Sequence, residues 1–176
     1  MKIALSFALV LACAPTAAPS SSPAQSPAGS SEASQRGFEQ LQTLVGTWES
    51  PTEGGDAIRV TYRLASYGSI LVQTFGSASG DDVTFTIFHL DGEHLMATHY
   101  CAQGNQPRLR LDPTATAEDG NLVFEYLDAT NLAGPAAAHL VRLEFAFDGA
   151  DRYSQIETYT AEGKADVTTR VFQRQR

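Results

Sequence analysis

The sequence predicts an all-β protein: an antiparallel up-and-down barrel of about eight to ten strands with a short N-terminal helix. About ten short runs rich in Val, Ile, Thr, Tyr and Phe follow one another along the chain. Turn signals such as Glu53-Gly-Gly-Asp56, Asp91-Gly92 and Asp119-Gly-Asn121 separate them. Consecutive strands with short loops form a meander. Because few helices remain to cover its edges, we expect this sheet to close on itself.

The first part of the chain, residues 1–12, has the pattern of a secretory signal peptide. Lys2 gives a positive start, and Ile3 to Ala12 is an apolar run without charge. This run is too short to span a bilayer as a folded helix. It ends at Val10-Leu-Ala-Cys13, which resembles the bacterial lipobox. We therefore expect Cys13 to be acylated. The alternative is ordinary signal cleavage, which would release a secreted or periplasmic protein.

Residues 13–36 are expected to form the lipidated Cys and a tether. Ser, Pro and Ala dominate this stretch, and it has no large apolar side chain. Such a composition cannot bury enough surface to offset the entropy of ordering, so the stretch should be flexible. Acyl chains on Cys13 would attach the protein to a membrane. Ala14 follows the Cys where an Asp would favour the inner membrane. The expected location is the cell envelope, on the periplasmic face of the outer membrane.

The charge balance argues against a nucleic-acid-binding protein, and the two cysteines argue against a disulfide-bonded one. The formal net charge is −8, and no cluster of Lys and Arg is present. Nucleic-acid binding needs concentrated positive charge, so nucleic acid is not an expected partner. If Cys13 is acylated, Cys101 has no intramolecular partner and remains a free thiol, either buried or reactive.

Residues 37–176 are long enough for one domain with its own core. Phe38, Leu41, Leu44 and Val45 recur at spacings of three and four, which predicts a short helix over 37–45. The expected strands are 46–50, 57–66, 69–76, 83–90, 93–101, 106–112, 121–128, 139–148, 152–161 and 166–174.

The start and the end of this domain carry a family resemblance. Leu44-Val-Gly-Thr-Trp48, directly after the helix, resembles the Gly-x-Trp signature of lipocalins and related calycins. The chain thus resembles a lipocalin-like bacterial lipoprotein of the calycin superfamily. The resemblance implies that an Arg of the last strand packs over Trp48 and closes the barrel. Arg170 matches that role, and Arg174 is a second candidate. A ten-stranded barrel like fatty-acid-binding proteins or nitrobindin fits equally well.

The hairpin from His94 to Leu111 concentrates two His, one Cys and two Arg. A two-residue turn at Asp91-Gly92 and a four-residue turn at 102–105 place its apolar side chains on one face. A soluble barrel buries that face, so the polar side chains should point outward and could dock a partner protein. A slip of one residue would invert this assignment. The expected exterior residues are His99, Cys101, Arg108 and Arg110.

The predicted function is binding of a small apolar or amphipathic molecule inside an envelope-anchored barrel. The expected ligand-binding residues are Tyr62, Phe85, His89, His94, Met96, Tyr100, Leu109, Phe124 and Phe145. Two alternatives stay open: these side chains only fill the barrel, or the protein is a non-catalytic structural or interaction lipoprotein that uses its exterior.

No motif supports an enzyme, a metal or a cofactor. His89 and His94 are too few for a closed zinc site, and His139 could add a third ligand only if the barrel brought it close. His99 and Cys101 lie about 7 Å apart on one strand, which is long for a thiolate–imidazole pair. We therefore predict no catalytic residue, no bound metal and no cofactor.

Overall fold

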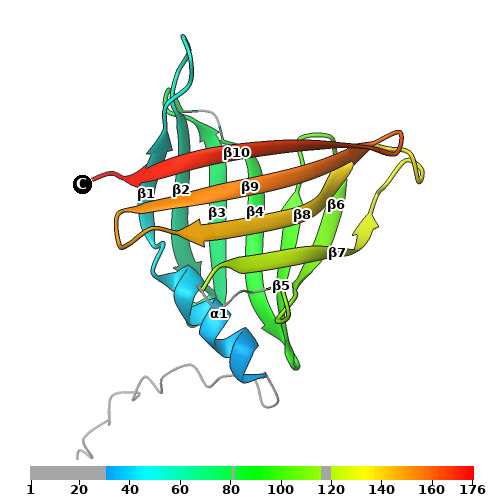
Figure 1. Ribbon diagram of the computed structural model, residues 1–176, viewed down its shortest axis with the longest axis horizontal. Coiled ribbons are helices and arrows are strands. Elements are labelled where there is room, and N and C mark those ends of the chain that lie inside the picture. Colours follow the sequence, from blue (N-terminus) through cyan, green and yellow to red (C-terminus); the bar gives the residue numbers. More distant parts are fainter. Residues whose placement is uncertain (1–30, 81, 116–119) are drawn as a thin grey trace, which may run out of the picture.

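The computed structural model describes residues 31–80, 82–115 and 120–176, which form a closed antiparallel barrel (Figure 1). The predicted fold class is confirmed. The predicted signal peptide and the Cys13 site lie outside the described residues. The elements are α1 (Glu32–Gln42), β1 (Gly46–Ser50), β2 (Ile58–Ala65), the 3-10 turn η1 (Ser66–Gly68), β3 (Ile70–Ser77), β4 (Asp82–Asp91), β5 (His94–Tyr100), β6 (Gln106–Leu111), β7 (Leu122–Thr130), β8 (His139–Phe147), β9 (Arg152–Ala161) and β10 (Lys164–Arg174).

Every strand pairs with its neighbours in the chain, and β1 pairs with both β2 and β10. This order, β1-β10-β9-β8-β7-β6-β5-β4-β3-β2, is a meander closed into a ring. Strands β2–β5 run across the direction of β8–β10, so the ring has two crossing walls (Figure 1). The ring is closed by two register pairs between β1 and β10, and most of β10 has a strand partner only in β9.

The helix begins earlier than its apolar spacing predicts. Ser31 caps it, because its Oγ accepts a hydrogen bond of 3.2 Å from the Ser34 N–H, and Glu32 lies in its first turn. Residues 32–36, which the sequence assigns to the tether, are therefore the first part of this helix. The hydrophobic pattern missed this turn because it is held by polar capping. The capped end is also fixed to the barrel, since the Ser34 Oγ donates to the Glu93 carbonyl at 2.8 Å.

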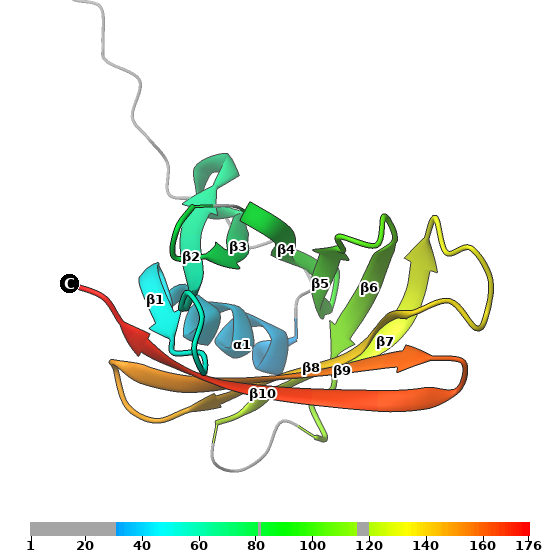
Figure 2. The ribbon, with the colours of Figure 1, turned by 90° about the horizontal axis from the view of Figure 1, so that it is seen from above.

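Helix α1 lies across one end of the barrel (Figure 2). Phe38 and Leu41 are buried on its inner side. Gly37 makes this close approach possible, because a Cβ there would lie 3.1 Å from Leu95 and 3.2 Å from Leu111. Within the described part of the chain, no helix is both long and apolar enough to span a bilayer. The largest fully buried side chains are Trp48, Tyr153, Phe88, Phe124, Phe145, Phe172, Leu41, Leu44, Leu71, Leu95, Leu109 and Leu122.

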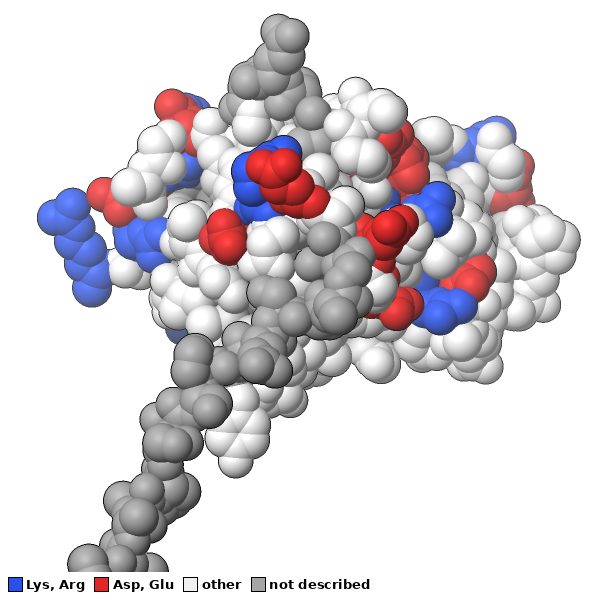
Figure 3. All heavy atoms as spheres, turned by 90° about the horizontal axis from the view of Figure 1, so that it is seen from below, with Lys and Arg blue, Asp and Glu red and all other residues white. Residues whose placement is uncertain are grey.

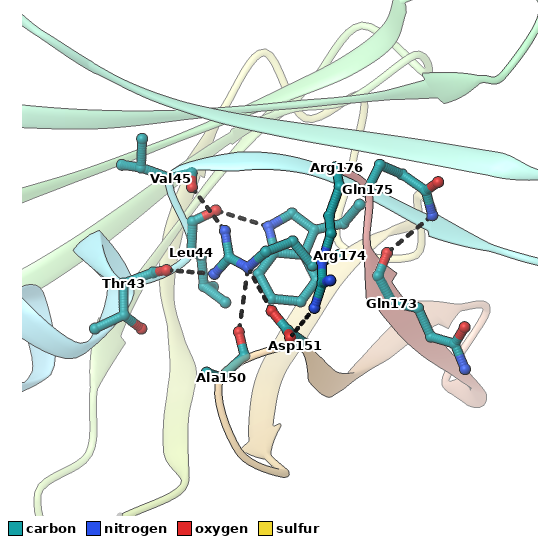
Figure 4. A network of polar contacts seen from close by, with 10 residues as sticks. Thr43, Leu44, Val45, Ala150, Asp151, Gln173, Arg174, Gln175 and Arg176 are labelled. Atoms are coloured by element: carbon teal, nitrogen blue, oxygen red, sulfur yellow. Dashed lines mark hydrogen bonds and ion pairs between the residues drawn. The ribbon is translucent and has the colours of Figure 1, made fainter.

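An arginine clamp closes the barrel where its first and last strands meet (Figure 4). The register pairs Trp48 directly with Arg174, and the guanidinium lies 4.1 Å from the centroid of the indole ring. The same guanidinium donates to the carbonyls of Thr43 at 2.8 Å and Val45 at 2.9 Å. It therefore joins the end of α1, the start of β1 and the end of β10.

The assignment of this role to Arg170 is wrong. Arg170 pairs in register with Gln155, and its guanidinium lies 5.3 Å from the centroid of Phe75, far from Trp48 along β10. Arg174, the second candidate, takes the role because it is the residue of β10 that stands opposite Trp48. The family resemblance indicated the kind of contact, whereas the strand register decides which arginine makes it.

Arg174→Ala should lower the free energy of unfolding by about 2 kcal/mol, because it removes a cation–π contact and hydrogen bonds to carbonyls at the helix end. Arg176→Ala is the matched control, since that side chain is 89% exposed and has only a 3.5 Å contact to Asp151. The control should change stability by less than about 0.5 kcal/mol. Urea unfolding followed by circular dichroism measures both. Equal effects of the two substitutions would contradict the clamp.

Candidate functional site

The two turns of the hairpin decide which of its faces is inside the barrel. The first turn is Gly92-Glu93, with Gly92 at φ +55°, and it pairs Asp91 with His94. This turn lies one position later than the expected Asp91-Gly92 turn. The same side chains of β4 and β5 still share a face, as the sequence predicts. The second turn spans 102–104, one residue shorter than expected, because the Cys101 N–H donates to the Asn105 carbonyl. Ala97 therefore pairs with Leu109.

This difference of one residue inverts the prediction for β4 and β5. Leu109 and Leu111 join the face that carries Ala97 and His99, and this face is the buried one. His99 is only 3% exposed, so its expected exterior position, together with that of Cys101 on the same face, is wrong. Phe85 and Tyr100, expected inside, pair with each other on the outer face and are 41% and 44% exposed.

The other predicted site residues divide between the two faces. Tyr62, Leu109, Phe124 and Phe145 lie in the buried interior. Met96 is opposite Arg110 on the outer face, although neighbours cover it, and His89 is on that face beside Met96 in register. His94 is exposed at the start of β5. Contact of the interior residues with a ligand stays a prediction.

The outer arginines are at the surface, as expected, but Arg108 is not free to hold a partner. Its guanidinium binds the Asp128 carboxylate, and this contact raises the pKa of Arg108 and lowers that of Asp128. Arg142 similarly bridges Glu125 and Glu144. In Figure 3, charges of opposite sign lie next to each other over the visible face. The described surface charges are thus largely arranged as local pairs.

A continuous set of polar side chains crosses the interior between β2 and β3 on one side and β9 and β10 on the other. We call it the polar wall; it consists of Tyr62, Gln73, Tyr153, Gln155, Glu157 and Arg170, from β2, β3, β9 and β10. The Tyr62 and Tyr153 hydroxyls are 2.9 Å apart, and the Gln73 amide donates to Tyr62 and to Gln155, each at 2.7 Å. The Gln155 amide donates to Glu157 at 2.9 Å. Each member therefore has a partner, which is what burial of polar groups requires.

The polar wall ends in an ion pair. Arg170 donates to the Glu157 carboxylate at 3.0 Å. The carboxylate is 13% exposed and the guanidinium 30% exposed. Burial raises the pKa of Glu157, while the positive charge of Arg170 acts against that rise. Burial likewise raises the pKa of Tyr62 and of Tyr153, so both stay as neutral phenols.

His99 joins β4 to β9 across the interior. Its Nδ1 is 3.0 Å from the Thr86 hydroxyl and its Nε2 is 3.1 Å from the Tyr159 hydroxyl. Burial lowers the pKa of His99 to about 4, so the imidazole is neutral at pH 7. A neutral imidazole has one donor and one acceptor nitrogen, and a hydroxyl can satisfy either. The structure therefore contains a hydrogen-bonded bridge from β4 through β5 to β9.

Tyr159 brings this bridge to the open end of the barrel. A hollow of about 270 Å³, the mouth hollow, is lined by Gln103, Ala138, Tyr159, Thr160, Ala161 and Asp166. Burial and the charge of Glu157 raise the pKa of Tyr159, and the Cys101 thiol acts on the same hydroxyl. The helix covers the other end, because Gly37 contacts Leu95 at the start of β5 and Cys101 follows the end of that strand.

Sequence reasoning missed Gln73, Gln155, Glu157 and Tyr159. The signal available was the alternation of Tyr153, Gln155, Glu157 and Tyr159 along β9, which places them on one face. Alternation does not say which face is inside. Gln155 and Glu157 would place that face outside, because hydrophobic patterning assigns such residues to solvent.

The histidines do not gather at a common point. His139 Nδ1 is 2.7 Å from the Ala137 carbonyl, and its ring is 5.0 Å from that of Tyr126. Across residues 31–80, 82–115 and 120–176, no group of three or more His, Cys, Asp or Glu could hold a metal ion.

No family model matches this chain, and no curated protein matches it significantly. The fold and site thus define its class by geometry alone. It is a closed ten-stranded antiparallel barrel, compatible with a calycin-like fold, with a helix at one end and a polar interior wall.

Acidification should destabilise the protein through His99. Its pKa is about 4 when folded against 6.5 ordinarily, so the unfolded chain binds the proton more readily. Stability is therefore lost as pH falls below about 6.5, by about 2 kcal/mol between pH 7 and pH 5. The raised pKa of Glu157 acts oppositely, since its contribution is lost as pH rises.

His99→Gln should reduce this loss, because the imidazole titration is removed. Urea unfolding of both proteins at pH 7 and pH 5 measures the difference. A loss of the same size in both proteins would show that His99 is not its source.

Proposed function

We propose that the protein is an envelope-anchored barrel that binds one small amphipathic molecule at the mouth hollow. The observation that carries this proposal is the position of Tyr159. Its ring lines the hollow, and its hydroxyl continues through His99 into the interior. A bound molecule therefore meets a tyrosine whose position is fixed by a hydrogen bond, in a concave site of the kind that small molecules usually occupy.

The polar wall supports binding over simple filling of the barrel. An apolar interior would stabilise the fold without the need to pair buried polar groups, each of which costs about 1–3 kcal/mol if it lacks a hydrogen-bond partner. This barrel instead buries Gln73 and Gln155, each 2% exposed, and an ion pair between Glu157 and Arg170. This network fixes Glu157, and the hydrogen bond to His99 fixes Tyr159 on the same face of β9, which together reduce the ordering needed when a ligand binds.

The lining of the hollow indicates the ligand class. Ala138, Ala161 and the Tyr159 ring offer apolar surface, whereas Asp166 and Gln103 offer oxygen acceptors at the rim. A volume of about 270 Å³ lies just below the usual range for drug-sized ligands, roughly 300–1,000 Å³. We infer a small molecule with an apolar body and a hydrogen-bond donor, such as a hydroxyl or an amine.

Ala138→Trp should abolish binding, because the indole would occupy the hollow. The matched control is Ala165→Trp, at an exposed position of β10 that does not line it. We expect native mass spectrometry of protein purified from its producing cells to show one added small-molecule mass on the parent and on Ala165→Trp but not on Ala138→Trp. A parent mass equal to that of the bare chain, or equal retention by both variants, would overturn the proposed binding site.

The anchor in this proposal is Cys13, and its support is the lipobox-like Val10-Leu-Ala-Cys13 after an apolar run. Cys13→Ser should move the protein from the membrane fraction to the soluble fraction when it is expressed in a bacterium. Intact mass spectrometry of the parent should show the added acyl groups on a chain beginning at Cys13. Absence of the acyl mass, or a Cys13→Ser protein still in the membrane pellet, would contradict the anchor.

A further inference from the structure

The outer face of the barrel carries an apolar groove that the ligand site does not use. It has a volume of about 390 Å³ and lies on β2, β3, β4 and β5. We call it the outer groove; Ala65, Ile70, Phe85, Ile87 and Tyr100 line it, with Arg63 at its side. Phe85 and Tyr100 are direct cross-strand neighbours, 41% and 44% exposed. Apolar grooves with exposed aromatic rings on a soluble face commonly mark a docking surface.

The charge around this groove is unusual for the chain. The protein has 20 acidic residues, yet no carboxylate lines the groove among the described residues, and Arg63 is its one charged side chain. A surface that docks on the groove should therefore be apolar and offer a negative group to Arg63. Two copies docked face to face would instead place their Arg63 side chains together without a lining acid to pair with them.

The place where the N-terminal segment joins the domain bears on what lies against the groove. The Ser31 N–H donates to the Glu93 carbonyl at 3.2 Å, in the turn between β4 and β5. Phe85 and Ile87 are on β4 and Tyr100 is on β5, so the segment joins the domain at the turn of the hairpin whose strands carry the groove, and the Phe85–Tyr100 pair lies at the far end of these strands. About 17 residues separate Cys13 from Ser31, and they span at most ~60 Å. An anchor at Cys13 thus holds this hairpin within reach of the membrane.

We propose that the outer groove rests on the lipid surface to which Cys13 is attached, an inference that depends on the acylation of Cys13 in the proposed function. Phe85 and Tyr100 enter the boundary between headgroups and acyl chains, where aromatic rings are favoured, and Arg63 pairs with a lipid phosphate. The attachment makes this second contact effectively intramolecular, so a weak apolar surface is enough to hold one orientation. Strands β8–β10, on the other wall in Figure 2, then face away from the membrane.

Quenching by brominated lipid tests this orientation. The acylated full chain is placed in phosphatidylcholine vesicles whose acyl chains carry bromine. Phe85→Trp reports on the groove. Val167→Trp is the matched control, because Val167 is a 60% exposed apolar residue of β10 outside the groove. The buried Trp48 is common to both, so the parent protein gives the baseline. We expect the emission added by Phe85→Trp to be quenched at least about twofold more than that added by Val167→Trp.

Equal quenching at the two positions, or none at either, would overturn the proposal. Tyr100→Trp gives a second reporter in the same groove if Phe85→Trp does not fold. A dimer in analytical ultracentrifugation that dissociates in Phe85→Ser would also overturn it, because a second copy would then cover the groove. If intact mass shows no acyl group, the anchor has failed separately. The same quenching comparison on the unacylated chain then decides whether the groove binds lipid by itself.

Discussion

Closure of the sheet at β1 and β10 is the constraint on which the rest of this structure depends. The seam has only two register pairs, Trp48 with Arg174 and Glu49 with Gln173, whereas β9 and β10 pair along most of their length. The Arg174 guanidinium compensates for this short seam by covering Trp48 and binding the carbonyls that follow α1. Once the ring is closed, every strand has one face inside and one outside, and no side chain can change face without a bulge.

Ring closure explains why one barrel has two different functional surfaces. Inside, the polar wall and the His99 bridge run toward the mouth hollow, and each depends on partners from several strands. Outside, the apolar side chains of β4 and β5 have no such partners and form the outer groove. The usual arrangement of polar residues outside and apolar residues inside is thus locally reversed. Such a reversal costs stability, and it is expected where a surface has a task other than folding.

The fold was predictable from the sequence, but the site was not. Turn residues and β-rich runs locate the strands well, because short loops leave few alternatives to a meander. The face on which a side chain lies depends on the strand register. The observed turn, 102–104, is one residue shorter than the expected turn, 102–105, and this difference places His99 in the interior instead of at the surface. The register is also the reason why Arg174, and not the predicted Arg170, packs over Trp48. The polar wall joins residues about 80 or more positions apart, such as Gln73 and Gln155, and no local pattern reports that distance.

The mouth hollow, at the open end of the barrel, is the proposed binding site. The most direct test is an experimental structure of the protein purified from its producing cells without extraction of small molecules. We expect density for one small molecule in the mouth hollow, within hydrogen-bonding distance of Asp166 or Gln103 and in contact with Tyr159. A hollow that holds only ordered water, or a molecule bound elsewhere on the barrel, would contradict it.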